Sequence, residues 1–264
     1  MRVTFTELAP AEFRSAIDGF VAVYAAAMNP PQRMLAGRDS ILDRHAANPG
    51  FRSLAALAEG EPGVSASRSP WPPEPSPARA IIDRIRRAHG RAPAVPLRLV
   101  GFTYGFHGAP GQWWHDMVAG ALAQGAARAR RAFELGAPGG LGGAPGGAGA
   151  QDGDPGWLDD SFEVAELHVV PARQGVGIGR ELLLRLTADR PERTAVLSTA
   201  DTESRARRLY RGLGFTDLLT GYRFAGAEPP YAVMGARLPL GSVPAPADGG
   251  PDAASPRSPS PSNW

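Results

Sequence analysis

Residues 161–190, SFEVAELHVVPARQGVGIGRELLLRLTADR, constrain the fold of this chain more than any other stretch. Residues 162–170 are rich in β-branched and apolar side chains, which predicts a strand that ends at Pro171. A glycine-rich turn follows. After the turn, apolar side chains recur at helical spacing, namely Ile178, Leu182, Leu183 and Leu186. The stretch therefore predicts a strand, a tight turn and a helix in direct succession.

The turn itself has the composition of an anion-binding site. Gly175, Gly177 and Gly179 occupy alternate positions, so no Cβ holds a ligand away from the backbone N–H groups. The helix that begins there contributes unpaired N–H groups and the positive end of its dipole. Arg173 and Arg180 supply positive charge on either side. These features predict a site for a phosphate or a pyrophosphate.

Two familiar phosphate motifs do not fit the turn. A P-loop requires a lysine, and the chain contains none; a dinucleotide fingerprint requires a third glycine where Arg180 stands. The turn instead resembles the Q/R-x-x-G-x-G/A signature of the GNAT superfamily of N-acetyltransferases, matched by Gln174, Gly177 and Gly179. The resemblance implies that the loop binds the pyrophosphate of acetyl-CoA. The cofactor contacts that it implies are Val169, Arg173, Gln174, Gly175, Val176, Gly177, Gly179 and Arg180.

A second hallmark of the same family lies downstream. Residues 194–200 predict a strand, and residues 204–213 predict a helix that closes with LYRGLGF at 209–215. A last strand is predicted at 231–238, and the resemblance extends over residues 162–240. It implies an α/β fold with a mixed, mainly antiparallel sheet of six or seven strands and helices on both faces. In this family the two central strands, here 162–170 and 194–200, splay apart to admit the pantetheine arm.

The N-terminal half follows the order of elements that this family has. The pattern predicts strands at 2–8, 51–59 and 97–106, and helices at 12–28, 32–47 and 112–135. We expect the strands at 51–59 and 97–106 to form a hairpin with a greatly expanded turn. The last helix begins with Trp113 and Trp114, for which packing on the core is the favoured interpretation over lining a substrate cleft.

Composition indicates one domain over residues 1–240. It is interrupted by low-complexity insertions at 60–80 and 136–156, and a disordered tail is expected at 241–264. No cysteine is present, which excludes disulfides and thiolate zinc sites, and no metal is expected. No long apolar run or signal peptide is evident, so we expect a cytoplasmic protein without a membrane partner.

The net charge does not indicate nucleic-acid binding. It is only +2, and the high isoelectric point of about 9.4 arises because every strongly basic residue is arginine. The arginines recur at helical spacing among acidic and small residues, which favours solvated helix faces. We therefore expect no nucleic-acid partner, and a monomer or a homodimer.

Acetyl transfer from a thioester to an amine needs a base for the amine, a donor for the developing oxyanion and a proton for the departing sulfur. The resemblance implies the backbone N–H of Val169 as the oxyanion donor, at a bulge in the strand 162–170. It implies Tyr210, in LYRGLGF, as the acid or as a group that positions the sulfur.

Three residues are candidates for the base. Glu163 and Glu166 are three positions apart, so in a regular strand only one of them faces the cleft. We rank Glu166 first, since it shares its side with His168, then Glu163, then His168. Removal of the proton through water alone is the alternative. In the following strand, Ser198 stands where some family members carry a glutamate, and a serine cannot act as the base.

The function predicted from these residues is acetyl transfer from acetyl-CoA to a primary amine. The acceptor, a small molecule or a peptide, stays open at this point. One alternative is a non-catalytic acyl-CoA-binding or regulatory domain of the same fold. Another is an unrelated nucleotide-binding α/β protein, against which LYRGLGF argues.

Overall fold

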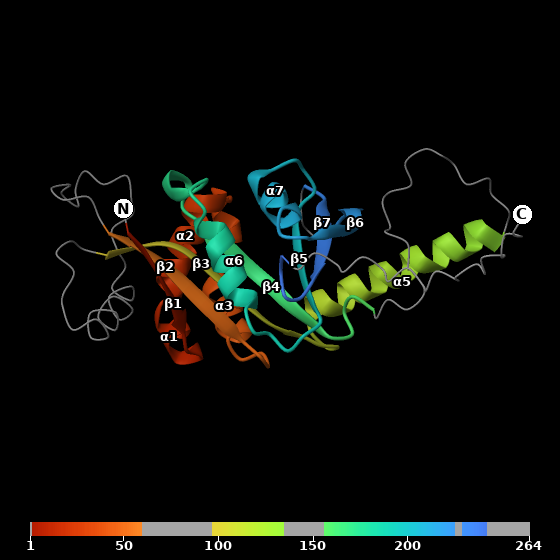
Figure 1. The fold of residues 1–264 in the computed structure, drawn as a ribbon, viewed down its shortest axis with the longest axis horizontal. Coiled ribbons are helices and arrows are strands. Elements are labelled where there is room, and N and C mark those ends of the chain that lie inside the picture. The colour runs from red at the N-terminus through yellow and green to blue at the C-terminus, as the bar shows by residue number, and fades with distance from the viewer. Residues whose placement is uncertain (1, 60–96, 135–155, 225–228, 242–264) are drawn as a thin grey trace, which may run out of the picture.

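The computed structural model describes residues 2–59, 97–134, 156–224 and 229–241 (Figure 1). Nearly all residues of the predicted insertions and of the predicted tail lie outside these ranges. Seven strands form one sheet in the order β1-β2-β3-β4-β5-β7-β6. They are β1 (Val3–Leu8), β2 (Arg52–Glu59), β3 (Leu97–Gly108), β4 (Ser161–Val169), β5 (Thr194–Ala200), β6 (Thr216–Tyr222) and β7 (Tyr231–Arg237).

All neighbouring strands are antiparallel except β4 and β5, so the predicted mixed, mainly antiparallel sheet is confirmed. The sequence analysis missed β6. This strand lies at the edge of the sheet, and its pairing with β7 is interrupted twice. Its sequence, TDLLTGY, also lacks the regular alternation of apolar and polar residues by which a strand is recognised.

The helices are α1 (Pro10–Ser15), α2 (Ile17–Met28), α3 (Arg38–His45), α5 (Trp113–Glu134), α6 (Ile178–Thr187) and α7 (Arg205–Arg211). Two predicted helices are shorter than expected. The first is broken at Ala16, whose φ of −107° and ψ of 2° are not helical. The second is replaced by a 3₁₀ turn, Gln32–Met34, and by α3. Helix α3 begins directly after Gly37, which has a φ of 74°. None of the helices in the described ranges combines the length and hydrophobicity needed for crossing a bilayer.

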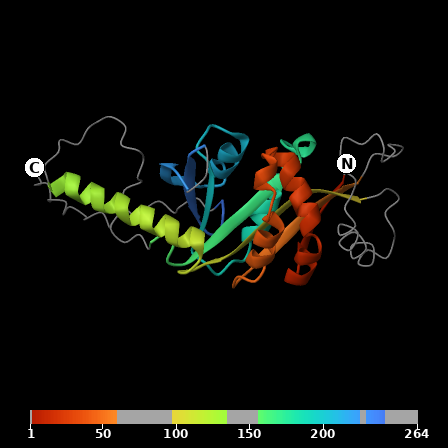
Figure 2. The ribbon, with the colours of Figure 1, turned by 180° about the vertical axis from the view of Figure 1, so that it is seen from behind.

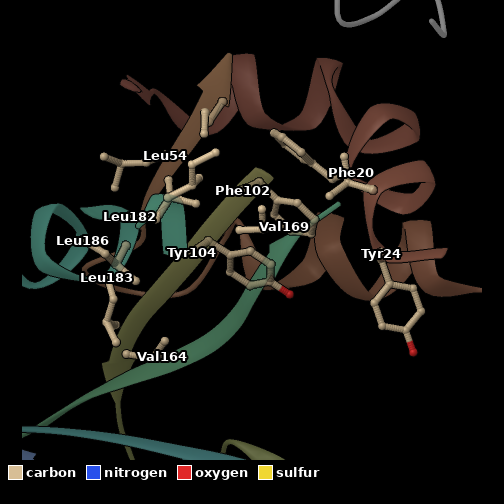
Figure 3. Packing of buried hydrophobic residues seen from close by; sticks show 14 of the residues in the cluster. Phe20, Tyr24, Leu54, Phe102, Tyr104, Val164, Val169, Leu182, Leu183 and Leu186 are labelled. Carbon is tan, nitrogen blue, oxygen red and sulfur yellow. The ribbon is translucent and has the colours of Figure 1, made fainter. Parts of the chain in front are cut away.

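The helices lie on both faces of the sheet, as the two opposite views show (Figures 1 and 2). Helices α6 and α7 lie on one face, which we call the loop face. Helices α1, α2, α3 and α5 lie on the other, which we call the acceptor face. On the acceptor face, Phe20 of α2 stacks on Phe102 of β3 with ring centroids 4.6 Å apart. Figure 3 shows Leu182, Leu183 and Leu186 of α6 on the side of the strands away from Phe20 and Tyr24.

Side chains alternate between the two faces along β5. Leu197 belongs to the large core that includes α6 and Tyr210 of α7. Val196 belongs to a second, smaller core with Val118 of α5. The half of the sheet formed by β5, β7 and β6 is therefore covered by α7 on the loop face and by α5 on the acceptor face.

The two central strands separate soon after they meet. Strands β4 and β5 pair only at Ser161↔Thr194, Phe162↔Ala195 and Glu163↔Val196. Beyond these pairs, β4 continues to Val169 along β3, while β5 continues to Ala200 along β7. The predicted splay is thus present, and it opens at Glu163.

Candidate functional site

The glycine-rich turn after β4 is open towards the solvent. Gly175 and Gly177 adopt φ values of 82° and 91°, a backbone conformation that only glycine takes without strain. Gly177 is the N-cap of α6, and a Cβ placed there would meet no atom within 4 Å. The first N–H groups of α6 have no partner within the helix. The loop therefore offers backbone donors beside an open space, which fits the binding of an anion.

Three arginines surround this loop. Arg173 and Arg180 are the two that the sequence indicated. The third is Arg205 on α7, whose Nη1 lies 3.9 Å from the position that a Cβ would take at Gly175. None of the three forms an ion pair within the part of the chain that the structure describes. Unpaired positive charge and backbone donors together fit a diphosphate such as that of coenzyme A.

The backbone of Val169 points into the splay. The N–H of the next residue, Val170, donates to the carbonyl of Val100 on β3 at 3.0 Å. Because successive peptide groups of a strand point to opposite edges, the N–H and C=O of Val169 face away from β3. The C=O accepts a hydrogen bond of 2.9 Å from Nε2 of Gln174, which ties the glycine loop to the end of β4.

The bulge in β4 lies at Ala165 and not at Val169. Tyr104 of β3 pairs with Glu166, and the next residue, Gly105, pairs with Val164, so Ala165 is the extra residue. This insertion corrects the expectation that Glu163 and Glu166 point to opposite sides. Their partners, Phe106 and Tyr104, are two positions apart on β3 and share the acceptor face, so both carboxyl groups share it too.

Glu166 is the centre of a buried ionic network. It forms an ion pair with Arg38 of α3, and its Oε2 lies 3.1 Å from Nε2 of His168. The hydroxyl of Tyr104 lies 3.2 Å from its Oε1. Burial raises the pKa of Glu166, but the hydrogen bonds and charges of His168 and Arg38 outweigh burial and lower it. Glu166 is therefore held as a carboxylate with little tendency to accept a proton.

Glu163 has a very different environment. Only 6% of the residue is exposed, and its Oε2 has no hydrogen-bond partner among the described residues. Burial raises the pKa of Glu163 from its ordinary value of 4.5 to about 8. It stands at the vertex of the splay, where the pairing of β4 with β5 ends. A carboxyl group with this pKa is suited to take up a proton near neutral pH.

Tyr210 lies on α7, on the loop face. It is buried in the large core, and its ring centroid is 5.8 Å from that of Phe215. Burial raises the pKa of Tyr210 to about 12. The phenol therefore stays protonated at neutral pH, and it is available as a hydrogen-bond donor.

The predicted residues lie on elements at both faces of the sheet, on either side of the splay. The glycine loop and Tyr210 belong to the loop face, Val169 lies at the end of β4, and Glu163, Glu166 and His168 lie on the acceptor face. The sequence analysis did not identify Arg38 or Arg205. Arg205 lies four residues before Leu209, about one helical turn away. The Cδ2 of Leu209 is 3.4 Å from the position that a Cβ would take at Gly179. This spacing was the only local sign in the sequence that Arg205 lies near the loop.

The tryptophan pair is divided between two environments. Trp113 is 61% exposed, but its ring centroid lies 5.6 Å from that of Phe224 in the second core, so the prediction of core packing holds for this residue only in part. Trp114 packs against the second core, and its Nε1 donates a hydrogen bond of 3.1 Å to Oγ of Ser198 on β5. Among the described residues, no three histidine or acidic side chains gather as they would around a metal ion.

Comparison with known proteins gives one strong match in sequence. A curated protein of Mycobacterium tuberculosis (strain ATCC 25618 / H37Rv), named GCN5-like protein acetyltransferase Rv2170, is 32% identical over 243 residues. The match covers 91% of this chain and 100% of that protein. No protein-family model matches the chain.

Solved structures of acetyltransferases are also similar to this chain, at low sequence identity. Arabidopsis thaliana NAA60, in complex with a bisubstrate analogue, has a TM-score of 0.47 and 13% identity, over 90% of this chain and 99% of that one. An acetyltransferase of the GNAT family from Streptococcus pneumoniae has a TM-score of 0.44 and 10% identity, over 90% of this chain and 100% of that one.

Proposed function

This chain belongs to the GNAT superfamily of acetyltransferases, and from that premise we propose that it transfers an acetyl group from acetyl-CoA to a primary amine. One observation carries the proposal. The sheet opens where β4 and β5 part, between the glycine-rich loop on one face and a buried carboxyl group on the other, whose Oε2 has no hydrogen-bond partner among the described residues. This combination suits acetyl transfer, because an acyl donor bound on the loop face and an amine bound on the acceptor face would meet in the opening.

The loop face supports the binding of coenzyme A. We propose that the backbone of residues 174–179 and the N-terminus of α6 bind the diphosphate, with Arg173, Arg180 and Arg205 as counter-charges. When bound, acetyl-CoA supplies the activated acyl group as a thioester. The N–H of Val169, which faces the splay, then donates to the oxyanion that develops on the acyl oxygen.

On the acceptor face, we propose Glu163 as the general base in preference to Glu166. Glu163 has a pKa of about 8 and no hydrogen-bond partner for its Oε2 in the described part of the chain. The pKa of Glu166 is lowered by its ion-pair partners, which makes it a weak base. The amine nitrogen forms the new C–N bond, the C–S bond of the thioester breaks, and Glu163 takes the proton that the amine loses.

The acceptor that we propose is an amine carried by a protein. The support comes from the mycobacterial relative, which is named a protein acetyltransferase and is matched over 100% of its own length by 91% of this chain. A peptide amine was one of the two classes that the sequence left open. A small-molecule amine is the other, and an acceptor panel distinguishes them.

The proposed function predicts both ligand binding and turnover. Coenzyme A at millimolar concentration should raise the melting temperature, because a ligand that binds only the folded state stabilises it by mass action. Acetyl-CoA together with a panel of peptide and small-molecule amines should release free thiol, measured with a chromogenic disulfide reagent. A thermal shift without thiol release from any amine would favour the non-catalytic binding domain. Absence of both would contradict the proposal.

Tyr210→Phe tests the role of the phenol. A thiol has an ordinary pKa of about 8.5, so transfer of a proton from a phenol of pKa about 12 to a thiolate is unfavourable. We therefore expect Tyr210 to donate a hydrogen bond to the departing sulfur. Loss of such a bond to a charged group should lower kcat by about 10- to 100-fold.

The affinity for coenzyme A and the pH dependence of Tyr210→Phe below pH 10 should match those of the wild type. A loss above about a thousandfold would indicate full proton transfer from the phenol. An unchanged kcat would identify Tyr210 as a packing residue.

A further inference from the structure

Ser198 lies on β5 at the open edge of the splay, two residues beyond the strand partner of Glu163. The last pair between β4 and β5 is Glu163↔Val196, and Ser198 lies two residues beyond Val196 on β5. Residues two apart on a strand share a face, so Ser198 lies on the acceptor face, roughly 7 Å along the strand. Its own strand is fixed by pairing with β7 on the other side, at Ser198↔Val233.

The hydrogen bond from Trp114 orients this serine. The indole Nε1 donates to Oγ of Ser198 at 3.1 Å, and the partly buried ring packs against the second core. A serine hydroxyl has two acceptor lone pairs and one proton. The indole occupies one lone pair, and within the described ranges no group accepts the proton. One lone pair and the proton are thus left for a ligand in the splay.

We infer that Ser198 binds the attacking amine, an inference that rests on the proposed acetyl transfer. The free lone pair of Oγ accepts one N–H of the amine, while the second N–H points to Glu163, which takes that proton. The nitrogen lone pair then faces the thioester carbon, with which the C–N bond forms as the C–S bond breaks. Trp114 is a positioning residue, since it acts on the amine only through Ser198.

This arrangement favours primary amines over secondary amines. A primary amine has two N–H groups and satisfies Ser198 and Glu163 together. A secondary amine has one, so either Ser198 faces a carbon substituent or Glu163 receives no proton. The wild type should therefore prefer a primary amine to its N-methyl derivative by at least about tenfold, the usual effect of one hydrogen bond.

The experiment compares wild type, Ser198→Ala, Ser198→Thr, Trp114→Phe and the double variant Ser198→Ala with Trp114→Phe. The substrates are the primary amine that is most active in the thiol-release panel and its N-methyl derivative. Ser198→Ala should lower kcat/KM for the primary amine by about tenfold and leave the N-methyl derivative unchanged, so that the preference disappears. Ser198→Thr keeps the hydroxyl and should retain most of the preference.

A double-mutant cycle separates positioning from packing. Trp114→Phe should lower kcat/KM severalfold by itself and have no further effect in the Ser198→Ala background, because the indole then has no hydroxyl to orient. The dissociation constant of coenzyme A should stay unchanged in every variant.

Two results would overturn the inference while leaving the proposed function intact. One is an active wild type with an equally active and equally selective Ser198→Ala. The other is additive losses in the double-mutant cycle, which would show that Trp114 only supports the core. If the wild type releases no thiol with any amine, the proposed function and this inference both fail.

Discussion

Replacement of Glu163 by glutamine is expected to lower kcat/KM for the amine by about 10²–10⁴-fold, the usual contribution of a positioned general base. Glutamine has nearly the same shape as glutamate but takes up no proton. Glu7→Gln is the matched control, because Glu7 is an exposed carboxylate on β1, paired with Arg52 at 3.0 Å. Its kcat/KM should stay within about twofold of wild type, as surface ion pairs contribute little.

The pH dependence of kcat/KM tests the role of Glu163 as the base without relying on the absolute rate. Glu163 has a pKa of about 8 in the folded protein, so kcat/KM of the wild type should rise as the pH passes through about 8 and the carboxyl ionises. In Glu163→Gln this rise should vanish, and only the titration of the amine itself should remain. An unchanged profile with wild-type turnover would show that water removes the proton.

Stability measurements test whether unfolding of Glu163→Gln causes its expected loss of kcat/KM. The carboxyl group of Glu163 has an ordinary pKa of 4.5, which it regains in the unfolded chain, and a pKa of about 8 when folded. Between these values the folded state binds the extra proton, so the free energy of unfolding should decrease as the pH rises towards 8. Glu163→Gln lacks this penalty. At pH 9 it should therefore melt no lower than the wild type.

The part of the site that could be predicted from the sequence is the part whose signals are local. Strand β4, the glycine turn and helix α6 follow one another without a gap, and each has its own period or residue type. The turn in particular requires glycine, because Gly175 and Gly177 adopt positive φ values. The strand partners β2 and β3 were also recognisable, although about 40 residues separate them.

The relative orientation of the two glutamates was beyond sequence reasoning. Residues 164–166 contain no glycine or proline that would indicate a bulge at Ala165. The extra residue is visible only in the pairing of the two strands, where Tyr104 pairs with Glu166 and Gly105 with Val164. A regular strand was the only basis for assigning faces, and it placed Glu163 and Glu166 on opposite sides.

Contacts between distant elements escaped prediction for a related reason. Arg38 and Glu166 are separated by 128 residues, and Trp114 and Ser198 by 84. No local pattern marks either pair, and only the packing of α3 and α5 against the sheet brings them together. The environment of Glu166, and with it the choice between the two candidate bases, depends on the first of these contacts.

The second large effect concerns the anion loop. Gly177→Glu should weaken the binding of coenzyme A by at least about 100-fold. A carboxylate and a diphosphate about 4 Å apart repel each other by roughly 4 kcal/mol at an effective dielectric constant of 20. The side chain would enter the space in front of α6, where a Cβ at this position meets no atom within 4 Å. Binding is measured by titration calorimetry with coenzyme A.

A matched control separates the two effects of Gly177→Glu, namely charge repulsion of the diphosphate and strain in the backbone. Gly177 has a φ of 91°, so any side chain there is strained, by roughly 1–2 kcal/mol. Gly214, in the turn between α7 and β6, has a φ of 92° and equally open surroundings. Gly214→Glu should therefore lower the melting temperature as much as Gly177→Glu does, yet bind coenzyme A like the wild type.

Gly177→Ala completes the comparison, because it adds strain and a small side chain but no charge. Its affinity for coenzyme A should lie between those of the wild type and Gly177→Glu. If Gly177→Glu is folded and binds coenzyme A as tightly as Gly214→Glu does, the diphosphate does not lie at the N-terminus of α6. Arg173, Arg180 and Arg205 would then have no common ligand, and coenzyme A would have to enter the splay by another route.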